Sequence, residues 1–163
     1  MKKLLLSVFA LTGIFIATNA QSTDNKSHNV TLTLSNQMEV LFTQGASGAS
    51  MSFTTPDNYT NGVTADNAAR LQVRSNKAYN VTVKTAAAAF TSTSATTMPV
   101  NNVLYVKEAG QSTYVNLAST DQNLLSNQAR GTNSFNVSYK ATPGFNYDGG
   151  TYVVSVVYTA TQL

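Results

Sequence analysis

Residues 79–84 read Tyr79-Asn80-Val81-Thr82-Val83-Lys84, and this stretch decides the fold class. Its apolar residues alternate with polar ones, a period of two that places them on one face of a β-strand. Aromatic and β-branched side chains also suit a pleated surface that is buried on one side. The stretch therefore predicts a half-buried strand, which needs a second layer to cover its apolar face.

The same alternation recurs on both sides of this stretch. Further strands are predicted at residues 30–35, 38–42, 71–73, 103–107, 113–117, 135–139 and 152–159. Polar or glycine-containing stretches separate them and predict loops at residues 44–50, 56–67 and 143–150. The last strand is apolar on much of both faces, which is typical of a central strand or of one at an interface.

One segment favours a helix instead of a strand. Residues 121–130 begin with Asp121, a good N-cap residue, and Gly131 follows at the position where helices often end. Together, about eight short strands and their turns predict an all-β fold, an antiparallel immunoglobulin-like β-sandwich in one domain. The chain has no cysteine or tryptophan, so tyrosine and phenylalanine must supply the aromatic part of the core.

The N-terminus has the three parts of a secretory signal peptide. Lys2 and Lys3 precede an apolar run over residues 4–17, and Thr18-Asn19-Ala20 supplies small residues for cleavage before Gln21. The apolar run is shorter than the roughly 20 residues that a membrane-spanning helix needs. We therefore expect a signal peptide at residues 1–20, a polar leader at 21–28 and the β-sandwich domain at 29–163, secreted to the periplasm or cell surface.

The net charge changes once the signal peptide is set aside. The full chain carries ten basic and seven acidic residues, a net charge of +3. Removal of Lys2 and Lys3 leaves eight basic residues against seven acidic ones, a net charge of +1. The remaining basic residues are scattered along the chain, so the sequence does not predict a nucleic-acid partner.

The composition excludes much of enzyme chemistry. Without cysteine the chain has no disulfide, thiolate metal site or cysteine nucleophile, and a single histidine, His28, excludes a multi-histidine metal site. No serine stands in a nucleophile elbow. The seven carboxylates show no pattern that selects a catalytic pair: Asp24, Glu39, Asp57, Asp66, Glu108, Asp121 and Asp148. We therefore predict no catalytic residue, metal or cofactor, with a small carboxylate-dependent hydrolase as a minor alternative.

Two segments are similar to bacterial surface proteins. Leu71-Gln72-Val73-Arg74-Ser75-Asn76-Lys77-Ala78-Tyr79-Asn80-Val81-Thr82-Val83 and the ending that starts at Gly150-Thr151-Tyr152 resemble WxL-like domains and related secreted β-sandwich proteins. The chain has Ala78-Tyr79 where that family carries a tryptophan-centred motif. The resemblance implies a cell-surface β-sandwich with a structural or adhesive role.

A weaker resemblance links the two ends of the mature chain to fimbrial subunits that assemble by donor-strand exchange. A polar leader is followed by alternating Val30, Leu32 and Leu34, which would be the strand-donor segment. The residues that would form an interface strand near the C-terminus are Gly150, Tyr152, Val154, Val156 and Tyr158. The resemblance implies β-augmentation, in which the extension of one subunit completes the sheet of the next. The alternative is that both segments pair within their own subunit.

These observations define the functional hypotheses. The main one is a secreted, non-enzymatic structural or adhesive surface protein that contacts proteins or envelope glycans through sheet edges and loops. The second is a pilin-like subunit that self-associates by strand donation. An adhesive protein would depend on the loops at residues 56–67 and 143–150, whereas a pilin-like subunit would depend on residues 29–35.

Overall fold

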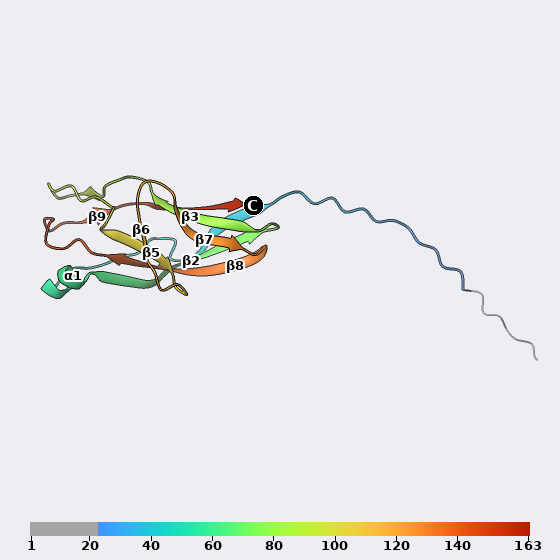
Figure 1. The fold of residues 1–163 in the computed structure, drawn as a ribbon, viewed down its shortest axis with the longest axis horizontal. Coiled ribbons are helices and arrows are strands. Elements are labelled where there is room, and N and C mark those ends of the chain that lie inside the picture. Colours follow the sequence, from blue (N-terminus) through green and yellow to red (C-terminus); the bar gives the residue numbers. More distant parts are fainter. Residues whose placement is uncertain (1–22) are drawn as a thin grey trace, which may run out of the picture. The chain divides into compact units, whose positions relative to one another are not determined.

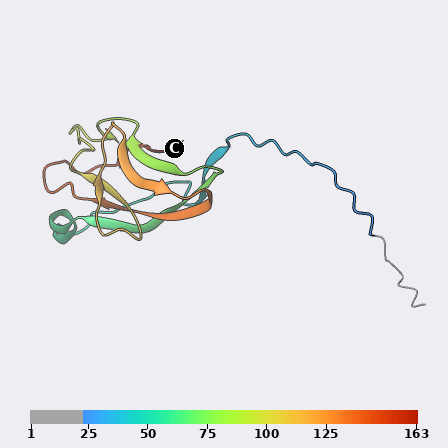
Figure 2. The same ribbon diagram turned by 45° about the vertical axis from the view of Figure 1, so that its right-hand side comes forward.

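The computed structural model describes residues 23–163, so the expected signal peptide and its cleavage site lie outside the described residues. Residues 34–163 form one compact unit of antiparallel β-structure. The all-β sandwich expected from the alternating pattern is confirmed. Figures 1 and 2 show its two main layers, with a short helix, α1 (Pro56–Asn61), at one end.

The first layer is a five-stranded sheet in the order β1-β2-β8-β5-β6. Its strands are β1 (Met38–Gln44), β2 (Val63–Ser75), β8 (Gly131–Ala141), β5 (Leu104–Glu108) and β6 (Val115–Asn116). β2 is the longest strand of the described chain and pairs with β1 on one side and β8 on the other. β5 and β6 pair antiparallel as a hairpin, within the two strands that the sequence predicts at residues 103–107 and 113–117.

The second layer is a three-stranded sheet in the order β10-β3-β7. Its strands are β10 (Val156–Gln162), β3 (Tyr79–Thr85) and β7 (Gln122–Gln128). β4 (Thr91–Ser92) and β9 (Tyr152–Val153) form a separate two-stranded sheet. β2 and β3 are consecutive but lie in different sheets, so the turn between them crosses from one layer to the other.

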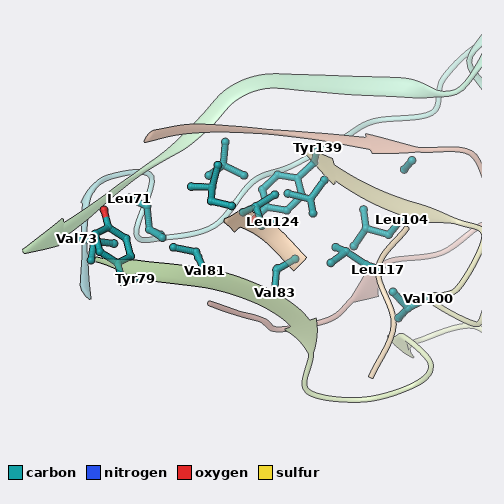
Figure 3. Close-up of a cluster of buried hydrophobic side chains, with 14 residues drawn as sticks. Leu71, Val73, Tyr79, Val81, Val83, Val100, Leu104, Leu117, Leu124 and Tyr139 are labelled. Carbon is teal, nitrogen blue, oxygen red and sulfur yellow. The ribbon is translucent and has the colours of Figure 1, made fainter. Parts of the chain in front are cut away.

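Both sheets contribute to one hydrophobic core (Figure 3). From β3, Tyr79, Val81 and Val83 are completely buried, as their alternation predicts. The other core residues come from β7 in the same sheet and from β2, β5 and β8 in the larger sheet, and the connections add Val100 and Leu117. This shared burial is the main force that holds the layers together.

Two sequence predictions of local structure are wrong. Residues 121–130 do not form a helix, because residues 122–128 are β7, an edge strand paired with β3. Irregular pairing with β3 lets Leu124 and Leu125, which are adjacent in sequence, both become buried. Residues 56–67 do not form one loop either, because α1 and the start of β2 occupy most of that range.

The two predicted end strands also differ from expectation. Residues 23–37, which include Val30, Leu32 and Leu34, form no helix or strand. The predicted C-terminal strand is divided: Tyr152 lies in β9 and Val156 and Tyr158 in β10, whereas Gly150 and Val154 lie in neither. Among residues 23–163, β10 pairs with β3 alone, so in this part of the chain it is an edge strand and not a central one.

Candidate interaction surface

β1, an edge strand of the larger sheet, has a row of core-facing side chains that the rest of the fold covers only in part. Met38, Val40 and Phe42 of β1 pair in register with Ser75, Val73 and Leu71, three buried residues of β2. Paired residues share a face of the sheet, so the three β1 side chains point to the core side. They nevertheless remain 36%, 37% and 42% exposed. This part of the core face therefore lacks a covering strand.

β10 presents the matching row from the other layer. Val156, Tyr158 and Ala160 pair with the buried β3 residues Thr85, Val83 and Val81, yet each is only half-buried. The ring of Tyr158 contacts the ring of Phe42 edge-on, with centroids 5.9 Å apart. We call the six residues Met38, Val40, Phe42, Val156, Tyr158 and Ala160 the seam, because they follow the open side of the sandwich between its two layers.

The free edge of β10 carries unpaired backbone groups along the seam. Ser155 O accepts a hydrogen bond from Ala86 N, and Leu163 N donates to Ala78 O, so odd-numbered positions face β3. In an antiparallel strand successive residues direct their backbone groups to opposite sides. The N–H and C=O groups of Val156, Tyr158 and Ala160 therefore point to the open edge. Such an edge is a template for another strand.

One residue of the seam, Tyr158, is hydrogen-bonded to a tyrosine of the other layer. The hydroxyls of Tyr139, from β8, and Tyr158, from β10, lie 2.7 Å apart and link the two layers. Burial raises the pKa of both tyrosines above the ordinary value, and Tyr139 raises that of Tyr158 further. Both rings therefore stay neutral well into the alkaline range.

The predicted donor residues are among the most exposed apolar side chains of the described chain. Val30, Leu32 and Leu34 are 74%, 81% and 86% exposed. Exposure of three apolar side chains at every second position costs free energy in water. A strand that covered them would recover much of that free energy. The strand expected at residues 30–35 is not formed, and the use of Val30, Leu32 and Leu34 as a donor segment stays a prediction.

One asparagine fixes the chain where the extension meets β1. Asn76 Nδ2 donates to Ser35 O at 2.7 Å, and its Oδ1 accepts from Gln37 N at 3.0 Å. Gln162 Nε2, at the end of β10, donates to Gln37 O at 2.9 Å. The sequence pattern assigns no role to Asn76 or Gln162. A side chain that binds residues about 40 positions away leaves no local signal.

A second exposed group lies at the opposite end of β2, around α1. Tyr59 stacks on Phe145 with ring centroids 5.1 Å apart and contacts Phe53 at 5.5 Å. Phe145 is 68% exposed, and Tyr59 is half-buried. The two loops that an adhesive role singled out, residues 56–67 and 143–150, thus meet through these rings.

The residues considered for metal binding form no cluster in the described part of the chain. Within residues 23–163, no group of three or more histidine, aspartate or glutamate side chains could hold a metal ion. Glu39 pairs with Arg74 at 3.2 Å and Asp121 with Lys84 at 3.4 Å, both on the surface. His28 is exposed in the segment without regular structure.

Comparison with known proteins adds no family to this picture. No family model matches the chain, and no curated protein matches its sequence. Among residues 23–163, no helix combines the length and the apolar character needed to cross a lipid bilayer.

Proposed function

We propose that this chain is an exported, non-enzymatic structural subunit that assembles by β-strand addition at the seam. The observation that carries the proposal is a pair of incomplete features in the same chain. One is an extended, exposed and alternating apolar segment, residues 29–35. The other is a β10 edge with free backbone groups and a half-exposed core-facing row. Each supplies what the other lacks.

The physical complementarity is direct. An added strand beside β10 makes main-chain hydrogen bonds along the edge and directs every second side chain toward the core side. Val30, Leu32 and Leu34 share that spacing, while Thr31 and Thr33 would face water. Burial of one such apolar side chain contributes about 1.5–3 kcal/mol. Three of them contribute about 4.5–9 kcal/mol, and the newly covered seam and the main-chain hydrogen bonds add to this against the cost of ordering the segment, about 1–2 kcal/mol per residue.

The donor side is tested in the full mature chain. On unboiled gels the wild type should give a ladder of assemblies. Replacement of Val30, Leu32 and Leu34 by serine should abolish this ladder and leave monomers in size-exclusion chromatography. The matched control replaces Thr31 and Thr33 by serine, on the opposite face of the same segment, and should leave the assemblies unchanged. Assemblies that persist in the triple variant, or a wild-type chain that is monomeric at all concentrations, would reject strand addition.

The acceptor side is tested at Ala160. Its N–H points to the free edge, so Ala160→Pro removes one edge donor without breaking a bond to β3; proline is tolerated on sheet edges. Assembly should be lost while the circular dichroism spectrum stays that of the wild type. Val157→Lys provides a second acceptor variant, since lysine on an edge opposes pairing and Val157 is exposed. Normal assembly by both variants would place the acceptor elsewhere.

A second function is favoured by the aromatic group around α1. Exposed, stacked rings such as Phe145 on Tyr59 are surfaces on which the apolar faces of sugar rings pack, which fits an adhesive role toward envelope glycans. Phe145→Ala should reduce retention on immobilised cell-wall glycan without changing assembly. Val153→Ala, at another exposed apolar side chain, is the control. Equal retention of both variants and the wild type would remove this role.

A further inference from the structure

The segment between the extension and β1 is held in place at both of its ends. Asn76 binds Ser35 O and Gln37 N through its side chain, and its own backbone N–H donates to Gln37 O at 3.3 Å. Gln162 Nε2 donates to Gln37 O and lies 3.3 Å from Asn76 Oδ1. Residues 35–37 therefore follow a single path into Met38, the first residue of β1.

This path determines which seam the extension can reach. Gln162 ends β10 beside Gln37, and Phe42 contacts Tyr158, so β1 and β10 run in opposite directions along the seam. An extension that covered its own seam would have to reverse direction within residues 35–37, immediately before β1. In the structure, the two ends of one asparagine side chain bind Ser35 O and Gln37 N, which favours an extended path through residues 35–37. The bonds to Asn76 therefore oppose the reversal.

We propose that Asn76, assisted by Gln162, is a positioning residue that prevents the extension from closing on its own seam and reserves it for a second copy of this chain. The inference rests on the proposed strand addition. It adds that the partner is a second copy of this chain and that Asn76 controls which seam the extension covers. Without the asparagine, residues 35–37 are free to turn, and the closed monomer competes with the assembly. Closure within one chain is favoured by its high effective concentration, so the restraint at residues 35–37 has to offset that advantage for assembly to prevail.

The test distinguishes cis from trans covering in the full mature chain. Equal amounts of unlabelled and ¹⁵N-labelled chains are unfolded together, refolded, cross-linked through lysines and analysed by mass spectrometry. Cross-links from Lys26, near the extension, to Lys84, opposite Val157 of β10, report where the extension lies. In the wild type, these cross-links should join differently labelled chains in the proportion expected from random pairing.

Asn76→Ala should shift those cross-links to chains of the same label and convert assemblies into monomers. Gln162→Ala, which keeps the asparagine, should give a smaller shift in the same direction. The matched control is Asn116→Ala, which also removes three side-chain hydrogen bonds, in the loop at Asn101 and Asn102. It should lower thermal stability without changing the labelling pattern, which separates a positioning role from a merely structural one.

Each other outcome rejects a defined statement. Randomly mixed cross-links in Asn76→Ala, as in the wild type, would overturn the role of Asn76 and leave strand addition intact. Same-label cross-links already in the wild type would show that the extension closes on its own chain despite the asparagine, and would also overturn it. Absence of any link between Lys26 and Lys84, together with absence of assemblies, would reject the proposed function itself.

Discussion

At the residue scale, the buried apolar side chains of β2 and β3 contribute strongly to the stability of the fold. Leu71 is 1% exposed and lies in the core beside the residues of β3 (Figure 3). Leu71→Ala should lower the free energy of unfolding by about 2–5 kcal/mol, because it removes buried methyl groups and leaves a cavity. Urea denaturation followed by circular dichroism measures the change. Leu163→Ala, at an exposed leucine, should change it by less than about 0.5 kcal/mol.

Loss of the side-chain hydroxyl should change the free energy of unfolding differently at two tyrosines. Tyr158→Phe leaves the Tyr139 hydroxyl without its partner and should cost about 0.5–1.5 kcal/mol of unfolding free energy. The hydroxyl of Tyr79 is buried and has no hydrogen-bond partner among the described residues. Tyr79→Phe should therefore be neutral or stabilising. A larger loss in Tyr79→Phe than in Tyr158→Phe would contradict this account of the two hydroxyls.

At the element scale, α1 and the start of β2 are set by local backbone geometry. Thr55 caps the helix in a capping box with Asn58, whose side-chain oxygen accepts from the backbone N–H of Thr55. Pro56 occupies the first turn, where its missing N–H costs nothing. These signals are present in the sequence, but they were outweighed there by the high content of polar and turn-forming residues. The helix is therefore a feature that sequence reasoning missed although its signal was present.

The glycine that joins α1 to β2 gives an element-scale prediction. Gly62 has φ +80°, and a Cβ atom there would lie 2.6 Å from the carbonyl oxygen of Ala141. Gly62→Ala should destabilise the fold through this clash and through the left-handed backbone. Gly149→Ala, where a Cβ would meet nothing within 4 Å, is the matched control. Thermal melting should show a clear loss for the first variant and almost none for the second.

At the scale of the whole molecule, the raised tyrosine pKa values predict how stability depends on pH. An unfolded tyrosine ionises near pH 10, whereas burial raises the pKa of Tyr139 and Tyr158 in the folded chain. Above pH about 10, the unfolded state therefore binds fewer protons than the folded state, and stability falls as pH rises. The contribution of these groups is fully present below that pH.

The measurement is the urea midpoint between pH 7 and pH 11, followed by circular dichroism. It should stay level up to about pH 9 and then decrease, as expected for tyrosines whose pKa is near 10 when unfolded. Tyr158→Phe should show a shallower decrease, because one raised group is gone. An equally steep decrease in that variant would mean that other groups govern the alkaline range.

The sequence by itself determined the fold class and the faces of the main strands. A period of two fixes which side chains share a face, and Tyr79, Val81 and Val83 lie in the core as that period requires. It also predicts residues 29–35 as a strand-donor segment, and this stays a prediction. It did not decide which strands are neighbours, because backbone hydrogen bonds are chemically the same at nearly every residue.

Only the tertiary structure decided that residues 122–128 pair with β3 as a strand. It also decided that β10 lies at the edge of its sheet, with its core-facing side chains opposite those of β1 across the seam. It also brought Asn76 to Ser35 and Gln37. These arrangements depend on contacts between residues far apart in the chain, whose energies exceed local preference. The physical reason is that local pattern specifies a surface for burial, whereas its partner is chosen by the packing of the whole fold.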